Sequence, residues 1–213
     1  MKNNRKILIV VFSLLAILYL IIVFTYPIRI KTNDYSIEIY SDGAHITKYC
    51  GDDKDVRLPN YVGIIPVTVI DKNCFASNDK IETVFIPNNI KFIRSEAFIE
   101  CRNLEAIEAE RIKCVDDDAF AYDNQLEIVE LGDNLQTIGE NAFEGCGMLT
   151  YIPSKDSVKE IGDHAFKGCE IEDPGDLTGI TVGEDAFVDC PWSASPNNPA
   201  SANYVNPEDE SEE

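Results

Sequence analysis

Residues 138–146 read IGENAFEGC, and this stretch recurs along the chain. Related segments occur at five other places, as IDKNCF, IRSEAF, VDDDAF, IGDHAF and VGEDAF. The phenylalanines that end the six segments are spaced by 23, 22, 23, 23 and 21 residues; they are Phe75, Phe98, Phe120, Phe143, Phe166 and Phe187. A period of about 20–29 residues is typical of leucine-rich repeats. The sequence therefore predicts six repeats, numbered 1 to 6 here by these phenylalanines.

Other apolar positions keep the same period. Four of them lie six residues after a phenylalanine and four lie three residues further on: Ile81, Leu104, Leu126 and Leu149, then Val84, Ile107, Val129 and Ile152. The alternation in LEIVEL, residues 126–131, predicts a strand with Val129 and Leu131 inward and Glu127 and Glu130 outward. One repeat cannot bury its apolar side alone, so neighbouring repeats must stack. We expect a β-rich solenoid with one short strand per repeat and short helical or 3-10 turns on the other side.

The repeat pattern A-F-x-x-C-x-x-L-x-x-[IV] resembles the BspA-like leucine-rich repeats over roughly residues 67–190. This resemblance implies a leucine-rich repeat solenoid in a bacterial surface-type protein whose repeats mediate protein recognition or adhesion. Residues 33–66 are expected to form an N-terminal β cap, with a hairpin turn at Ser41-Asp42-Gly43. Residues 168–185 lose the leucine of the pattern, which indicates a distorted closing repeat.

Four cysteines occupy the third position after a repeat phenylalanine: Cys101, Cys146, Cys169 and Cys190. Asn78 and Asp123 fill this position in the other two repeats. We expect a ladder of reduced, buried thiols, because free cysteine behaves as a small apolar residue. Disulfides between neighbouring repeats are the alternative, but they need suitable side-chain vectors. No C-x-x-C motif and no histidine at zinc spacing supports a metal site.

The first 28 residues have the pattern of a membrane anchor. A basic leader, residues 1–6, precedes an uncharged run at residues 7–28. A helix of that length reaches roughly 33 Å, enough to cross a hydrocarbon core of ~30 Å. A cleavable signal peptide is the alternative, but its apolar region is usually only ~7–15 residues long. The leader places the N-terminus inside, so we expect a single-pass cell-membrane protein with extracellular repeats, secreted if the segment is cleaved.

The overall charge restricts the partners. The formal net charge is −20 at pH 7, although residues 1–32 hold five basic residues and no acid. Such a surface repels nucleic acid and anionic lipid, so we expect no nucleic-acid partner. It would suit cations or a basic protein partner, although solubility alone is the commoner reason for an acidic surface. The tail at residues 191–213 has four prolines, five acids and no basic residue, which predicts a disordered acidic segment.

No catalytic motif is present, so we expect no enzyme activity, no cofactor and no small-molecule substrate. His164 falls in a variable repeat position and is expected at the surface. The run Asp116-Asp117-Asp118 lacks the spacing of a calcium loop and reads as a solvated turn, with weak calcium binding as a minor hypothesis.

The outward strand positions form the candidate binding face. They are Glu82, Thr83, Phe85, Glu105, Ala106, Glu108, Glu127, Ile128, Glu130, Thr150 and Tyr151, an acidic band with a few apolar residues. One hypothesis is a membrane-anchored protein that recognises or adheres to other proteins through this face. Another is a structural or assembly accessory of the cell envelope that acts through its membrane helix. A soluble fragment, residues 33–190, should keep binding under the first hypothesis and lose it under the second.

Overall fold

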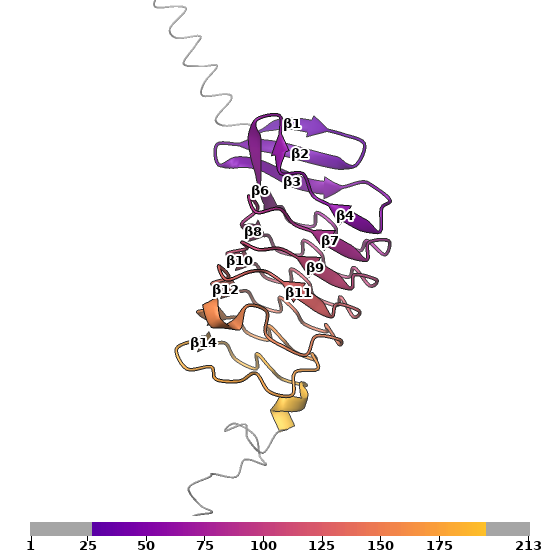
Figure 1. Ribbon diagram of the computed structural model, residues 1–213. Coiled ribbons are helices and arrows are strands. Elements are labelled where there is room, and N and C mark those ends of the chain that lie inside the picture. The colour runs from indigo at the N-terminus through magenta and orange to yellow at the C-terminus, as the bar shows by residue number, and fades with distance from the viewer. Residues whose placement is uncertain (1–26, 195–213) are drawn as a thin grey trace, which may run out of the picture.

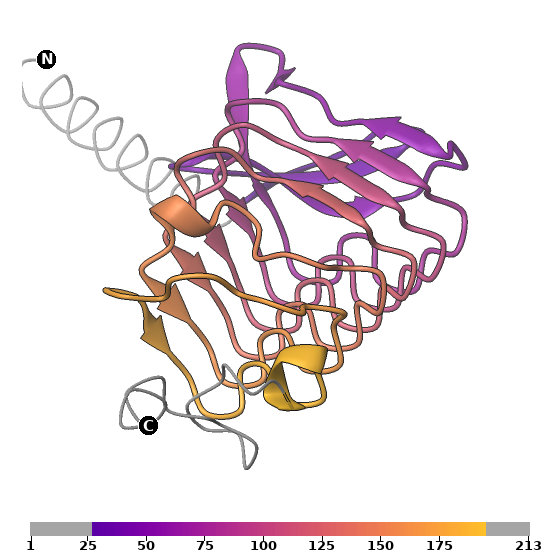
Figure 2. The ribbon, with the colours of Figure 1, turned by 60° about the horizontal axis from the view of Figure 1, so that its bottom comes forward.

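The computed structural model describes residues 27–194, and this part of the chain winds into a single stack of coils (Figure 1). Two sheets run along the stack. Sheet A has ten strands in the order β1-β2-β3-β6-β8-β10-β12-β13-β14, with β5 beside β6, and sheet B has four in the order β11-β9-β7-β4. Figure 2 shows the two walls of strands and a third side made of loops. The solenoid predicted from the repeat period is confirmed.

From β7 onward, the strands that the repeats contribute are only two or three residues long. Sheet A contains β1 (Ile28–Lys31), β2 (Tyr35–Tyr40), β3 (Gly43–Tyr49), β5 (Tyr61–Val62), β6 (Ile65–Ile70), β8 (Phe92–Ile93), β10 (Cys114–Val115), β12 (Thr137–Ile138), β13 (Glu160–Ile161) and β14 (Thr181–Val182). Sheet B contains β4 (Asp55–Arg57), β7 (Thr83–Phe85), β9 (Ala106–Glu108) and β11 (Ile128–Glu130). Two 3-10 turns, η1 (Lys155–Ser157) and η2 (Pro191–Ala194), are the only helical elements of residues 27–194.

The expectation of one strand per repeat was wrong for the central repeats, which contribute a strand to each sheet. The residue that opens each motif, such as Ile138 in IGENAF, is itself the inward residue of a second strand. The buried side chains of Ile70, Ile93, Val115, Ile138 and Ile161 form one column under sheet A. The expected helical turns are mostly absent too, because the third side of the coil consists of tight hydrogen-bonded turns.

A ladder of phenylalanine rings occupies the centre of the stack. Successive rings from Phe75 to Phe187 lie 4.7, 5.0, 5.2, 5.4 and 5.5 Å apart between centroids, with interplanar angles of 9° or less. Tyr49 extends the ladder toward the N-terminus, with its ring centroid 5.0 Å from that of Phe75. Stacked aromatic pairs contribute beyond their buried area, so the ladder both fills the core and fixes the spacing of the coils.

The backbone hydrogen bonds and φ angles recur once per repeat, as the side chains do. The N–H of each phenylalanine in repeats 1 to 5 donates to the alanine carbonyl of the next repeat, as from Phe143 to Ala165 at 2.8 Å. The residue two places before each phenylalanine is left-handed, with φ between 51° and 58°; these residues are Asn73, Glu96, Asp118, Asn141, His164 and Asp185. Asn, Asp and His tolerate this conformation better than most residues, which explains the composition of a position that looked merely variable. His164 is half-buried there rather than fully exposed.

The N-terminal segment joins the repeat sheets earlier than the boundary at residue 67 suggested. The strands β1, β2 and β3 pair antiparallel, and the hairpin between β2 and β3 falls at the predicted turn. However, β4 already pairs parallel with β7, and β6 pairs parallel with β3 and β8. The segment at residues 33–66 therefore combines an antiparallel cap with the first parallel strands of both walls.

The predicted membrane segment, residues 7–28, lies almost wholly outside the described residues. Ile28 is described, and it belongs to β1 instead of a helix. No helix within residues 27–194 is both long and apolar enough to span a membrane. Of the predicted tail, residues 191–194 form η2 and the remainder is likewise outside the described part.

We expect Phe143→Ala to lower the free energy of unfolding by about 3–5 kcal/mol, the range for large aromatic deletions in cores. The Phe143 ring is fully buried and stacks on a ring at either side, so the deletion leaves a cavity that neither neighbour can fill. Glu127→Ala is the control, because its side chain is exposed and the change should cost less than about 0.5 kcal/mol. Urea denaturation measures both, and equal midpoints would contradict the role given to the ladder.

Candidate functional site: the outer face of sheet B

The outer face of sheet B carries carboxylates in two columns. Parallel register aligns Phe85, Glu108 and Glu130 across β7, β9 and β11, with Arg57 of β4 at the end of the row. A second column runs just before the strands, through Glu82, Glu105 and Glu127. Neighbouring strands are about 4.8 Å apart, so the carboxylates of each column are close neighbours. The side chains between the columns point inward and are buried: Val84, Ile107 and Val129.

Most of these carboxylates have no counter-ion. Lys54 forms an ion pair with Glu82 at the N-terminal end of its column. Within residues 27–194 no Lys, Arg or His lies within ion-pair distance of Glu105, Glu108, Glu127 or Glu130. Like charges that face each other across strands are destabilising. This face therefore has a negative potential that the fold itself does not neutralise.

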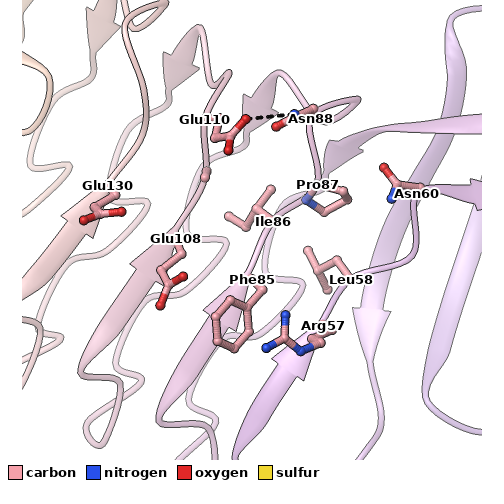
Figure 3. Close-up of a pocket in the computed structure, with 11 residues that line it drawn as sticks. Arg57, Leu58, Asn60, Phe85, Ile86, Pro87, Asn88, Glu108, Glu110 and Glu130 are labelled. Atoms are coloured by element: carbon pink, nitrogen blue, oxygen red, sulfur yellow. Dashed lines mark hydrogen bonds between the residues drawn. The ribbon is translucent and has the colours of Figure 1, made fainter.

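A groove borders the C-terminal end of these strands (Figure 3). Its wall includes Phe85, Glu108 and Glu130, and Ile86 and Ala109 lie in the same segment of their repeats. The guanidinium carbon of Arg57 lies 3.8 Å from the centroid of the Phe85 ring, a cation–π contact. This contact fixes the one cation of the row at its first strand. The acidic part of the groove thus begins at Glu108 and faces solvent.

The structure brings the proposed face together on sheet B and the coil that follows it. Ile128 and Tyr151 are both exposed, 47% and 40% of their surfaces, and Phe85 is half-buried. Ala106 differs from the expectation: it shares a row with Thr83 and Ile128 but is only 8% exposed. A single methyl group between larger side chains presents little surface to solvent. Tyr151 belongs to repeat 4, which adds no strand to sheet B.

Sequence reasoning missed Arg57, because residues 33–66 were assigned to the N-terminal cap. A signal was present: VRLPN at residues 56–60 and VFIPN at residues 84–88 both have Val, Pro and Asn at their first, fourth and fifth positions. That match would have placed Val56 inward and Arg57 in the row of Phe85.

The cysteine ladder is a packing feature in this structure. All seven cysteines are free, and the four repeat cysteines are buried. Each of their thiols donates to the phenylalanine carbonyl of the preceding repeat, at 3.0–3.1 Å; the pairs are Cys101–Phe75, Cys146–Phe120, Cys169–Phe143 and Cys190–Phe166. Burial raises the pKa of all four thiols. Because the thiolate is the reactive form, these cysteines are poor nucleophiles.

The aspartate run at residues 116–118 has separate local roles. Asp116 forms an ion pair with Arg94 at 3.2 Å and accepts a hydrogen bond from the Cys114 thiol at 3.0 Å. Asp117 accepts the backbone N–H of Glu140 at 2.9 Å. Asp118 occupies the left-handed position of its repeat. In the part of the chain that the structure describes, no group of three or more His, Cys, Asp or Glu side chains could hold a metal ion.

The comparison with protein families agrees with the geometry. The family model for the BspA type leucine rich repeat region matches six copies over residues 68–193. The chain belongs to this family. No curated protein matches its sequence.

Solved structures of bacterial repeat proteins share the fold. A leucine-rich repeat protein of T. pallidum is 23% identical with a TM-score of 0.63, over 77% of this chain and 90% of that one. A leucine rich cell surface protein of Faecalibacterium prausnitzii is 21% identical with a TM-score of 0.58, over 77% and 52%. The pneumococcal vaccine antigen PcpA is 19% identical with a TM-score of 0.56, over 78% and 48%. This chain therefore matches only about half the length of the last two.

Asp123 is the one residue with a charged side chain that is buried within residues 27–194. It takes the place that a cysteine fills in most of these BspA-type repeats. Its Oδ1 accepts the backbone N–H of Cys101 at 2.7 Å, while its buried Oδ2 has no partner. The ionisable groups around it are the thiols of Cys101 and Cys146. Burial raises the pKa of Asp123 well above its usual range, which favours the protonated carboxyl in the folded protein.

We expect Asp123→Asn to stabilise the protein by about 1–3 kcal/mol at pH 7, the cost of an unsatisfied buried group. An amide is neutral at every pH, so it is buried without the proton uptake that the carboxyl requires at pH 7. The folded pKa of Asp123 is raised above the unfolded value of about 3.9. Its protonated form therefore supports folding fully below that value, and the support is lost as pH rises toward the folded pKa.

The measurement is the free energy of unfolding at pH 4 and pH 7 for the native chain, for Asp123→Asn and for the exposed control Asp133→Asn. The free energy of unfolding of Asp123→Asn should exceed that of the native chain by more at pH 7 than at pH 4. For Asp133→Asn the difference from the native chain should be the same at both pH values. An advantage that is the same at both pH values would show that Asp123 is not protonated in the fold.

Proposed function

We propose that this chain is a non-catalytic scaffold that recognises a basic protein through the outer face of sheet B. One observation carries the proposal: Glu105, Glu108, Glu127 and Glu130 stand side by side on this face without a counter-ion among the described residues. Their mutual repulsion costs stability, and a cationic partner would relieve it. The neighbouring side chains of Ile128 and Tyr151 add exposed apolar area, which a protein partner can bury.

The chemistry of the remaining residues supports a binding role. The repeat thiols are buried and point at carbonyl groups, and the groove beside Glu108 and Glu130 contains carboxylates and amides but no paired nucleophile and base. Solenoids of this kind keep the inward positions constant and leave the outward positions free to vary. Recognition of another protein uses those outward positions directly.

We further propose that the repeats are displayed outside a bacterial cell and held by a single-pass anchor, the apolar run that begins at residue 7 and precedes β1. The apolar run and its basic leader support this location. The names of two structural neighbours, a leucine rich cell surface protein and a vaccine antigen, are in keeping with it. The anchor and the face then have separate tasks, one for location and one for recognition.

We expect the triple variant Glu108→Gln, Glu127→Gln and Glu130→Gln to weaken binding of a basic probe protein, lysozyme, roughly tenfold at low ionic strength, given about 0.2–1 kcal/mol per exposed charge. The matched control replaces Glu140, Glu160 and Glu184, exposed acids on or after the strands of sheet A, and makes the same change in net charge. Surface plasmon resonance on both variants separates a local effect from a general one. If both triple variants bind lysozyme equally weakly, the attraction is a nonspecific effect of the net charge of −20, and the sheet B face is not a specific site.

The same assay distinguishes the two functional hypotheses. A fragment should begin at residue 27 rather than 33, because β1 pairs with β2 through Ile28–Lys31. Recognition by the face predicts that residues 27–194 bind as the full chain does. A structural accessory that acts through its membrane helix predicts that the fragment loses binding to its natural partner.

The location is tested by external proteolysis of intact cells that produce the chain, followed by detection with an antibody to the repeats. We expect the repeat signal to disappear while a cytoplasmic control protein survives. Survival of the repeats until the cells are permeabilised would place them in the cytosol and remove the surface role.

A further inference from the structure

Sheet B stops halfway along the stack. Its last strand is β11 in repeat 3, although the phenylalanine ladder and sheet A continue through repeat 6. The sequence supplies the cause in repeat 4, where LTYIP at residues 149–153 aligns with LEIVE at residues 126–130. Pro153 takes the place of Glu130 and has no N–H with which to continue the ladder. β11 therefore has no neighbouring strand on its C-terminal side in the stack.

A side chain takes the position of the missing strand. The backbone N–H of Val129 donates to the phenolic oxygen of Tyr151 at 2.8 Å, and the hydroxyl of Tyr151 lies 3.5 Å from the carbonyl oxygen of Val129. In the preceding repeats the equivalent backbone groups pair with a neighbouring strand. A single hydroxyl thus covers the centre of an edge that normally holds a strand.

Two grooves border β11 and repeat 4, and Tyr151 lines the first of them. One is lined by the edge and its C-terminal continuation, including Val129, Leu131 and Gly132, with Arg111 as its cation. The other is lined by acids and small or apolar residues; these are Glu127, Gly147, Met148, Thr150, Glu170 and Glu172. Met148 and Ile128 are each 47% exposed. The edge is thus bordered by apolar surface within an acidic rim.

We propose that the β11 edge accepts an extended basic segment of a partner protein as a fifth strand of sheet B, and that the Tyr151 hydroxyl is the placeholder it displaces. This inference rests on the proposed recognition of a basic protein and specifies how that partner binds. Strand addition obtains affinity from backbone hydrogen bonds and specificity from alternate side chains.

The negative charge around the β11 edge favours a basic segment over other partners. Glu127, Glu130, Glu170 and Glu172 are exposed and have no ion-pair partner within residues 27–194. A segment that alternates Lys or Arg with apolar residues places all of its cations on the outer face of the sheet, beside Glu130, and all of its apolar side chains on the inner face, where Val129 lies. A second copy of this chain would instead bring the same carboxylates together, and the acidic C-terminal sequence would be repelled.

The test uses the full chain, purified with detergent, and a defined probe: the peptide acetyl-(Lys-Val)4-amide. Its control has the same sequence with alternate backbone nitrogens methylated, which keeps every charge but removes the donors for a ladder. We expect the control to bind about tenfold more weakly in calorimetry, the effect of one or two lost hydrogen bonds. Hydrogen exchange should also show protection of the Val129 amide by the unmethylated peptide alone.

Two variants test the placeholder. Tyr151→Phe removes the hydroxyl that occupies the edge, so we expect it to bind the unmethylated peptide several-fold more tightly, since one competing hydrogen bond is lost. The matched control is Tyr122→Phe, another exposed tyrosine that lines a separate groove with Glu100, Arg102 and Asn124. Equal affinities of the two variants would overturn the role of Tyr151 as placeholder.

The outcomes separate this inference from the proposed function. Equal binding of the two peptides, weakened by Glu127→Gln and Glu130→Gln, would leave acidic recognition standing and overturn strand addition. Absence of binding by both peptides would overturn strand addition as well. The proposed function itself is tested by the lysozyme assay. It fails if the sheet B triple variant and the sheet A triple variant bind lysozyme equally well.

Discussion

The stacking of equivalent side chains from one coil to the next is the interaction on which the rest of this structure depends. Six phenylalanine rings lie nearly parallel at centroid distances of 4.7–5.5 Å, and buried aliphatic columns run in register under the two sheets. No single repeat has enough apolar surface to fold alone, so each coil is stable only through its neighbours. Every buried position is consequently constrained twice, by the coil before it and by the coil after it.

This constraint also explains which unusual residues the core accepts. A thiol fits the third position after the phenylalanine because it is small and donates to a carbonyl of the preceding coil. Asp123 has the right size but brings a second oxygen that finds no partner. The stack therefore accepts a carboxyl at this position, but burial raises its pKa.

Function is left to the positions that the stack does not constrain. On sheet B these outward positions alternate with the buried Val84, Ile107 and Val129, so a run of glutamates in successive repeats becomes a column of neighbouring charges. The same periodicity that organises the core thus concentrates charge on the surface. Where the periodicity fails, at Pro153, the sheet ends and Tyr151 covers the exposed backbone.

The sequence alone determined the solenoid, the phenylalanine ladder, the buried thiols and the outward direction of Glu127 and Glu130, because each follows from a period that local residues repeat. It did not predict the second strand of each repeat, since two-residue strands such as Thr137–Ile138 are too short for an alternating pattern. The tertiary structure alone decided the contact of Arg57 with Phe85, the unpaired oxygen of Asp123 and the bond from Val129 to Tyr151. These depend on atoms that are 22 or more residues apart, and only the packing of one coil on the next brings them together.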